Sequence, residues 1–490
     1  MNNTRRQFLK TLLMSSAVAV AGPVSGHRTT PRFLWRVPAP DTQDPWDQVP
    51  EILARIKPPV FPRRYFDITK FGARGDNQAD CTAAFQNAIA ACNSAEGGRV
   101  VVPAGEFLTG AIRLKSNVDL HLEKGATVRF SRDTQKYPLV FTRWEGVELM
   151  NFSPCIYALQ EENVAITGAG TLDGNADCEH WWPWKGRKNC GWKQGDPEQA
   201  KDRNALFEMA ERGVPVSDRV FGKGHYLRPQ FIQPYRCKNV LLEGLTLKNS
   251  PMWQVHPVLC TNVTVHRMTI TGASPNRDSG PNTDGCDPES CTDVLISECE
   301  FNTGDDCIAI KSGRNADGRR LNAPSQNIVI QGCHMKDGHG GVTIGSEISG
   351  GVHHVFAQNC HMDSPHLDNA IRIKNNAMRG GLLEDIYARN INVGEVVLAG
   401  LSIDDLYEEG ESGKFRPIVR NVEVRNLTTK KAQYALYLRG LKSAPLENIR
   451  LVDSDLQGVE KANVVENVAQ LKLRNVRING RLVESGGATG

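Results

Sequence analysis

A short pattern of alternating apolar and polar residues recurs along most of the chain. Each copy begins with Asn, Asp or His, continues with β-branched or aliphatic residues at every second position, and then reaches Gly, Asn or Ser. The clear copies start 23 to 36 residues apart, which is the spacing of coils in a solenoid. Their first residues are Asn239, Asn262, Asp293, Asn327, His354, Asp385, Asn421 and Asn448, with a truncated copy at Asn475 and fainter ones at Asn117 and Asn163.

The sixth residue after each start is a small or medium-sized side chain in every clear copy. Such a recurring position predicts an inward ladder of side chains stacked along the solenoid, and it explains three cysteines as core thiols. Strands this short cannot bury a face alone, whereas stacked parallel coils can. We therefore predict an all-β fold, a right-handed parallel β-helix. The ladder residues are Leu245, Met268, Cys299, Cys333, Cys360, Ile391, Leu427 and Ser454.

One stretch near the N-terminus has a helical period instead. In "DCTAAFQNAIAAC", residues 80–92, the apolar positions Phe85, Ala88, Ile89 and Cys92 fall on one helical face, and Asp80 or Thr82 is the candidate N-cap. We expect this short helix to cap the N-terminal end of the β-helix.

The remaining segments divide the chain. Residues 1–26 resemble a twin-arginine signal peptide, with an ordinary Sec signal as the alternative, so a periplasmic or secreted bacterial protein is expected. Residues 27–63 are Pro-rich and are interpreted as an extended arm. The β-helix domain is expected over residues 64–485, with an insertion at about 177–235 where the repeat is interrupted.

Charge and cysteine content exclude several classes of function. The formal net charge is +3, and the basic leader accounts for it, so neither a nucleic-acid nor a membrane partner is expected. The thirteen cysteines form no CxxC pair that would indicate zinc, and we expect no cofactor and no metal.

Polar residues gather in four short motifs that keep step with the repeat. About one coil separates each motif from the next, so their side chains should lie on one face in neighbouring coils. Each motif alone is weak evidence, because any of them could be a turn or a solvated edge. The four are "NTD" with Asn282 and Asp284, "GDD" with Asp305 and Asp306, "GHG" with His339, and "RIK" with Arg372 and Lys374.

Three carboxylates beside two cations suggest hydrolysis of a glycosidic bond in an acidic sugar polymer. One carboxyl group must be protonated to donate to the leaving oxygen, and another must be ionised to activate water. Repulsion among Asp284, Asp305 and Asp306 raises the pKa of one of them, and we expect it to keep a proton on the carboxyl group that acts as the acid. Arg372 and Lys374 would bind the sugar carboxylate.

These motifs, in this order and spacing, resemble the signature motifs of the polygalacturonases, glycoside hydrolase family 28, over residues 64–480. The resemblance implies a parallel β-helix that hydrolyses α-1,4-galacturonosidic bonds with inversion and without metal. The roles it implies are Asp305 as general acid, Asp284 and Asp306 as the residues that activate water, His339 as support for the acid, and Asn282, Arg372, Lys374 and a later Tyr407 as substrate-binding residues.

The insertion bears on whether the enzyme acts at chain ends. Segments around "FTRWEGVELMNFSPCIYA" and "YLRPQFIQPYRCKNV" resemble bacterial exo-acting members, and an insertion could close one end of the substrate groove. Arg228 and His256 are candidate contacts in that closed subsite. Trp181, Trp182 and Trp184 would either stack on sugar rings or form a small core under the loop.

Several alternatives remain open at this point. A rhamnogalacturonan or xylogalacturonan hydrolase would have the same fold, as would a calcium-dependent pectate lyase or a non-catalytic polysaccharide-binding solenoid. The expected partner in each hydrolase case is a pectic polysaccharide or an oligogalacturonide. Asp287 and Glu289 could line the cleft or be surface acids, and the oligomeric state is open.

Overall fold

The computed structural model describes residues 44–272 and 280–484. The predicted leader and the first part of the predicted arm lie outside the described residues. None of the described helices is both long and apolar enough to cross a membrane.

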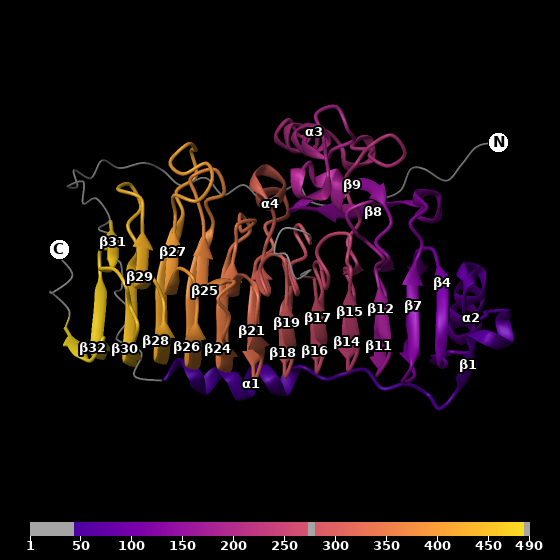
Figure 1. Cartoon of the computed structure of the whole chain (residues 1–490), viewed down its shortest axis with the longest axis horizontal. Coiled ribbons are helices and arrows are strands. Elements are labelled where there is room, and N and C mark those ends of the chain that lie inside the picture. Colours follow the sequence, from indigo (N-terminus) through magenta and orange to yellow (C-terminus); the bar gives the residue numbers. More distant parts are fainter. Residues whose placement is uncertain (1–43, 273–279, 485–490) are drawn as a thin grey trace, which may run out of the picture. The chain divides into compact units, whose positions relative to one another are not determined.

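Residues after the arm form stacked parallel sheets, so the predicted parallel β-helix and its helical cap are confirmed (Figure 1). The longest run of parallel pairs follows the repeat described above. In order of pairing it comprises β1 (Tyr65–Asp67), β3 (Gly98–Val102), β6 (Val118–Leu122), β11 (Glu162–Gly168), β14 (Lys238–Glu243), β16 (Thr261–His266), β18 (Thr292–Ser297), β21 (Ser325–Gln331), β24 (Val352–Met362), β26 (Leu382–Glu395), β28 (Ile418–Lys431), β30 (Glu447–Leu456) and β32 (Leu471–Ile478).

A second run of parallel strands joins the first at β24. It comprises β2 (Asp76–Asp80), β4 (Gly105–Thr109), β7 (Ala126–Phe130), β12 (Thr171–Asp173), β15 (Thr246–Lys248), β17 (Thr269–Thr271), β19 (Glu300–Asn302) and β22 (His334–Met335). At the C-terminal end, β33 (Arg481–Val483) turns back antiparallel to β32.

A third run of strands carries the predicted site. It comprises β5 (Ile112–Arg113), β10 (Ile156–Leu159), β13 (Ile232–Tyr235), β20 (Ile308–Ile310), β23 (Gly338–Ile344), β25 (Leu367–Lys374), β27 (Ala399–Asp404), β29 (Tyr434–Arg439) and β31 (Val464–Glu466). Single bridges at Val255 and Cys286 connect β13 to β20. Cys286 pairs with Ile308, and Ile308 pairs with Val342. This register aligns the predicted motifs from coil to coil.

The residue that begins each repeat has a positive φ, between 51° and 61° from Asn117 to Asn448. Asn and Asp tolerate this left-handed conformation better than other non-glycine residues, which explains their recurrence there. Neighbouring copies are linked by side-chain hydrogen bonds, for example from Asn239 Nδ2 to Asn163 Oδ1 at 2.8 Å and from Asn262 Nδ2 to Asn239 Oδ1 at 2.7 Å.

The prediction that a truncated copy of the repeat begins at Asn475 is wrong. β32 pairs Leu471 with Ile449, so that coil begins earlier, and Asn475 donates to Asp453 rather than to Asn448. Asp453 also has a positive φ and belongs to a second turn of the coil. Asn tolerates the positive φ at either turn of the coil, so the residue type alone does not show which of the two turns it occupies.

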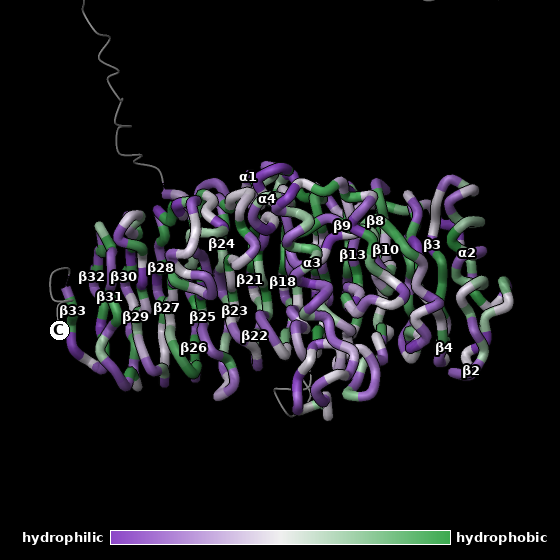
Figure 2. The backbone as a smooth tube through the Cα atoms, turned by 90° about the horizontal axis from the view of Figure 1, so that it is seen from above, coloured by the Kyte–Doolittle hydropathy of each residue, from purple (hydrophilic) through white to green (hydrophobic). Residues whose placement is uncertain are grey.

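The core follows the predicted inward ladder, whose eight residues are all buried. Cys299, Cys333 and Cys360 are free, buried thiols, as the repeat predicts. Hydrophobic stretches recur in strand after strand along the body, while most of the connecting loops are polar (Figure 2). The short strands therefore share one continuous core rather than several separate ones.

Two helices cover surfaces of the β-helix. α2 (Thr82–Ser94) buries Phe85, Ala88, Ile89 and Cys92 at the N-terminal end, and Asp80 Oδ1 accepts a hydrogen bond from the Thr82 backbone N–H at 2.9 Å. The described part of the arm was predicted to be extended, but it contains a 3₁₀ turn, η1 (Pro45–Asp47), followed by α1 (Gln48–Arg55). Trp46, Val49 and Ile52 pack there against Val329, Phe356 and Tyr387, which favours a helix over an extended strap.

The predicted insertion lies between β12 and β13 and is mainly helical. Its elements are η4 (Trp182–Lys185), η5 (Lys188–Cys190), α3 (Ala200–Glu211) and η6 (Val216–Asp218), with a disulfide between Cys178 and Cys190. A second elaboration was not recognised as one in the sequence: the antiparallel hairpin of β8 (Leu139–Trp144) and β9 (Val147–Phe152). The remaining short helices are η2 (Ile68–Phe71), η3 (Thr134–Lys136) and α4 (Asn315–Leu321).

The hairpin and the insertion pack together at one side of the β-helix, where Figure 1 shows α3, α4, β8 and β9 gathered. Trp181 and Trp182 are buried, and Trp181 meets Trp184 edge to face with ring centroids 5.0 Å apart. These tryptophans were predicted either to stack on sugar rings or to form a small core under the loop. In the structure they form the small core.

Candidate active site

Three predicted carboxylates converge on one point of the third strand run. Asp284, Asp305 and Asp306 each offer an oxygen within 4.8 Å of the other two. Asp284 precedes the bridge at Cys286, and Asp306 precedes the paired strand β20, so adjacent coils bring them together. The Asp284 and Asp306 side chains are 4% and 0% exposed, whereas Asp305 is 17% exposed. Asp305 is therefore the carboxyl group most accessible to a substrate.

Asp305 is paired with His339, the second residue of strand β23 in the next coil. Oδ1 of Asp305 lies 2.9 Å from Nδ1 of His339. Burial alone would raise the pKa of Asp305, but the charge and hydrogen bond of His339 outweigh it and hold that pKa below its ordinary range. The same carboxylate raises the pKa of His339. In the free protein, one proton is thus shared by this pair and lies mainly on the imidazole.

Asp306 is held ionised by two cations from β25. Lys374 Nζ lies 2.7 Å from Oδ2, and Arg372 lies 3.5 Å from Oδ1. Burial works to raise the pKa of Asp306, but Lys374 and then Arg372 outweigh it and lower the pKa. The Thr343 hydroxyl donates a further hydrogen bond to Oδ1 at 3.0 Å. Arg372 and Lys374 share a strand face, as their spacing predicts.

Among the three aspartates, Asp284 is the one whose pKa is raised, whereas the pKa of Asp305, the acid that the resemblance implies, is lowered. Burial is the main cause of the raised pKa, followed by the negative charges of Asp305 and Asp287. Burial, together with repulsion within the aspartate cluster, raises the pKa of one carboxyl group, as expected. The imidazole beside Asp305 decides which one, and its position is a tertiary contact.

Positive side chains already neutralise this carboxylate cluster. Lys374 and Arg372 pair with Asp306, His339 pairs with Asp305, and Lys311 lies 3.7 Å from Asp284. A divalent cation site would instead surround the oxygens with further oxygen ligands. These cations make the aspartate cluster a poor fit for a calcium site.

Tyr407 lies beside the two cations. Its ring centroid is 5.6 Å from the Arg372 guanidinium and 5.3 Å from Lys374 Nζ. The backbone N–H of Tyr407 donates to the Asn375 carbonyl oxygen, and its own carbonyl oxygen accepts from Asn376 Nδ2. These contacts hold the backbone of Tyr407 against the residues that follow β25.

Arg228 reaches the site through Asn282 rather than by contact with solvent. It is fully buried, and its guanidinium donates to Asn282 Oδ1 at 2.8 Å and to the Pro281 carbonyl oxygen at 2.7 Å. Asn282 Nδ2 in turn lies 3.4 Å from Asp305 Oδ2. The prediction of a direct substrate contact is wrong for Arg228, which instead connects the insertion to the aspartate cluster through Asn282.

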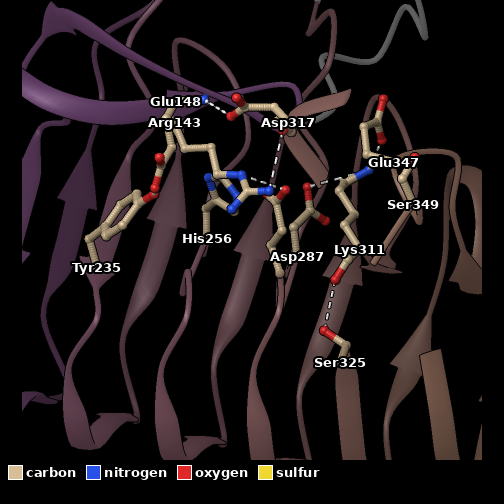
Figure 3. A network of polar contacts seen from close by, with 12 residues as sticks. Arg143, Glu148, Tyr235, His256, Asp287, Lys311, Asp317, Ser325, Glu347 and Ser349 are labelled. Carbon is tan, nitrogen blue, oxygen red and sulfur yellow. Dashed lines mark hydrogen bonds and ion pairs between the residues drawn. The ribbon is translucent and has the colours of Figure 1, made fainter. Parts of the chain in front are cut away.

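His256 also has no exposed surface, so the prediction of a substrate contact is wrong for it too. Its Nε2 lies 2.8 Å from Glu289, which also pairs with the buried Arg143 at 2.8 Å (Figure 3). Asp287 and Glu289 are likewise buried and neither line a cleft nor form a surface. The sequence around a single His or acidic residue does not indicate whether that residue belongs to a buried network or to a binding site.

Sequence reasoning missed two lysines near the site. Lys311 follows strand β20, five residues after the "GDD" motif ends, and lies among three buried carboxylates. Lys185, in the insertion, is half-buried, and among the described residues no carboxylate lies within ion-pair distance of it. Burial lowers its pKa, and the nearby charges of Glu145, Arg228 and Asp305 act on it. The position of Lys311 immediately after a buried strand of apolar residues was a usable signal, whereas Lys185 had none.

A parallel β-helix with paired aspartates, a histidine and two cations on adjacent coils defines a carbohydrate-active hydrolase. A profile of "Glycosyl hydrolases family 28" matches residues 221–475, and one of "Rhamnogalacturonase A/epimerase, pectate lyase-like" matches residues 65–123. The chain belongs to glycosyl hydrolases family 28, the polygalacturonase family that its motifs resemble. This membership sets aside the lyase and the non-catalytic alternatives.

Known proteins resemble the chain over most of its length. An exopolygalacturonase from Thermotoga maritima, described as hyperthermoactive, has a crystal structure with 46% sequence identity and a TM-score of 0.85, covering 89% of this chain and 96% of that one. A probable polygalacturonase of Vitis vinifera is 29% identical over 81% of this chain and 75% of its own length. An exo-poly-alpha-D-galacturonosidase of Dickeya chrysanthemi is 27% identical over 67% of this chain and 54% of its own.

Proposed function

We propose that the protein hydrolyses α-1,4-galacturonosidic bonds of polygalacturonate and removes units from the chain end, with inversion at the anomeric carbon. One observation carries the hydrolysis: the partly exposed Asp305 shares a proton with His339 and lies beside Asp306, which is kept ionised by Lys374 and Arg372. An acid and a base of opposite protonation state are what glycoside hydrolysis requires.

Asp305 acts as the general acid. Movement of the shared proton from His339 Nδ1 to Asp305 Oδ1, across 2.9 Å, leaves a neutral imidazole and a protonated carboxyl group. That carboxyl group then donates its proton to the glycosidic oxygen as the bond to the anomeric carbon breaks. A water molecule attacks this carbon and gives its proton to Asp306 or Asp284. Arg372, beside Tyr407, binds the galacturonate carboxylate through its guanidinium.

The exo mode rests on the insertion. Arg228 of the insertion connects to Asp305 through Asn282, so the inserted segment lies directly beside the acid on one side of the site. The hairpin reinforces this wall, because Glu145 at its tip pairs with Arg203 of α3 at 2.7 Å. A wall this close to the acid leaves room for few sugar units on that side. The exopolygalacturonase of Thermotoga maritima supports the same conclusion by its overall similarity.

Purified protein incubated with polygalacturonic acid tests this proposal. We expect saturated monomer or dimer to appear alone, without new ultraviolet absorbance, and EDTA to leave the rate unchanged. A ladder of saturated oligomers would keep hydrolysis and overturn the exo mode. Ultraviolet-absorbing products that disappear with EDTA would contradict hydrolysis. No product at all would direct the assay to rhamnogalacturonan and xylogalacturonan.

The stereochemistry provides an independent prediction. The carboxylate oxygens lie within 4.8 Å of one another, closer than the 6.5–9.5 Å carboxyl separation that is typical of inverting enzymes. Inversion is nevertheless expected, because Asp284 and Asp306 are almost fully buried and cannot reach an anomeric carbon as nucleophiles. Proton NMR of the first product should show the β-anomer; the α-anomer would mean retention.

Lys185→Gln tests the subsite beside the wall. The unpaired ammonium is available to the carboxylate of the terminal sugar, so we expect KM for a galacturonate trimer to rise about tenfold while kcat changes by less than about threefold. The matched control is Lys188→Gln, an exposed neighbour in the same insertion, which should leave both constants unchanged. An unchanged KM in Lys185→Gln would exclude this contact.

Export through the twin-arginine route is part of the proposal. The basic pair Arg5 and Arg6 before a short apolar run supports it. Replacement of both by Lys should retain the protein in the cytoplasm, as measured by cell fractionation, if the route is the twin-arginine one; continued export would favour a Sec signal.

A further inference from the structure

Lys311 occupies an unusual position beneath the active site. It follows β20, its side chain is 3% exposed, and three carboxylates surround its ammonium. Nζ lies 3.3 Å from Glu347, 3.7 Å from Asp284 and 4.0 Å from Asp287. Figure 3 shows Lys311 between Asp287 and Glu347. No side chain of this group touches solvent to any great extent, so water screens these charges only weakly.

Lys311 is the main positive charge that compensates the buried carboxyl groups of Asp284 and Asp287. The ring of Trp253 lies 4.3 Å from Nζ and closes one side of the lysine. Among the described residues, neither carboxyl oxygen of Asp287 has a hydrogen-bond partner, nor does Oδ1 of Asp284. A buried carboxylate without such partners is strongly disfavoured unless a cation is near. For Asp284 and Asp287 that cation is Lys311.

We propose that Lys311, held in place by Glu347, is a positioning residue that allows Asp284 to ionise and accept the proton of the attacking water. This inference rests on the proposed function, in which Asp284 helps to activate water. Lys311 itself does not touch the substrate, because its ammonium is enclosed by carboxylates and by Trp253. It acts on the reaction only through its charge.

The charges around Asp284 determine the direction of the effect. Negative neighbours and burial oppose its ionisation, and Lys311 opposes them. Glu347 in turn partly neutralises Lys311, and it also binds Arg314 at 3.4 Å. The charged groups that face Asp284 or Lys311 are Asp287, Arg228 from the insertion, Asp305, Asp306, Lys374 and Glu347.

Lys311→Met removes the charge and retains most of the volume. Loss of a cation 3.7 Å away makes a carboxyl group harder to ionise, so activity should begin to rise only at higher pH. We expect the acid limb of the kcat/KM profile to move up by at least one pH unit and kcat at pH 5 to fall at least tenfold, with KM changed by less than about threefold. Lys311→Arg should restore the limb to within about half a unit, because it keeps the charge.

Glu347→Gln should shift the same limb in the opposite direction. Without its negative charge, Lys311 and Arg314 act more strongly on Asp284, which should then ionise at lower pH. A purely structural disturbance would not produce shifts of opposite sign in two variants of one ion pair. The surface control is Lys336→Met, whose partner Glu300 is 45% exposed and which should leave the profile unchanged.

Opposite shifts in Lys311→Met and Glu347→Gln would support the proposal. A uniform loss of activity with an unmoved acid limb in both variants would overturn it and assign Lys311 a structural role only. A direct readout separates this result from a failure of the proposed function: carbon-13 NMR titration of aspartate-labelled protein, with Asp284→Asn for assignment. If the wild type did not hydrolyse polygalacturonate, the Asp284 carboxyl titration in Lys311→Met would still decide whether Lys311 controls it.

Discussion

Asp305→Asn is expected to lower turnover on polygalacturonate at least a thousandfold. The substitution keeps the size of the side chain but removes the only group of the aspartate cluster that is both exposed and supplied with a proton by an imidazole. Without it, the leaving oxygen departs unprotonated, and general acid catalysis of this kind contributes about 10²–10⁴-fold. Reducing-end release under saturating substrate measures the effect.

Binding should survive this substitution, which separates a catalytic role from a structural one. We expect the substrate Kd of Asp305→Asn, measured calorimetrically, to stay within about threefold of the wild type. Asp453→Asn is the matched control, since Asp453 is 52% exposed and Asn also tolerates its positive φ. A loss of turnover below tenfold in Asp305→Asn would refute its assignment as the acid.

Lys374→Ala is expected to reduce both activity and stability. Lys374 and Asp306 form a buried ion pair at 2.7 Å, and removal of Lys374 leaves the buried Asp306 carboxylate with Arg372, 3.5 Å away, as its remaining ion-pair partner. Such a deletion costs about 3–5 kcal/mol of unfolding free energy. The pKa of Asp306 should rise as well, because Lys374 is the main cation holding it down, so kcat/KM should fall at least a hundredfold.

The effect on Asp306 and the effect on substrate binding can be separated. Denaturant unfolding measures the stability, and affinity for galacturonate oligomers measures the contact with the sugar carboxylate. Lys431→Ala serves as the control, because Lys431 makes an ion pair of 2.6 Å with Glu395 that is largely exposed and should contribute less than about 1 kcal/mol. Unchanged affinity, turnover and stability in Lys374→Ala would contradict both roles.

Arg228 and His256 were predicted to contact the substrate, but both belong to buried polar networks. The residue types at Arg228 and His256 are suited to binding an acidic sugar, and both come from the right part of the chain. In the structure, Arg228 donates to Asn282, and His256 lies against Glu289, so each stabilises a neighbour of the site. Whether a polar side chain faces solvent depends on what packs over it, here the hairpin and the insertion.

The tryptophans of the insertion illustrate the same limit. Trp181 and Trp184 pack against each other and against Phe152 of the hairpin. A stacking platform for sugars and a small hydrophobic core use the same residues in sequence. Only the neighbouring hairpin, which the repeat pattern did not reveal, distinguishes the two.

The β-helix, its capping helix and the proximity of the four motifs could all be predicted from the amino-acid sequence. Each depends on a periodic rule: asparagine tolerates the left-handed turn that begins a coil, alternating residues face the core, and residues one coil apart become neighbours. The pKa differences among the three aspartates, by contrast, depend on tertiary contacts. The pKa of Asp284 rises because of its burial and the negative charges of Asp305 and Asp287, and that of Asp305 falls because His339 outweighs its burial. Such electrostatic effects depend on distances between coils that no local pattern of residues encodes.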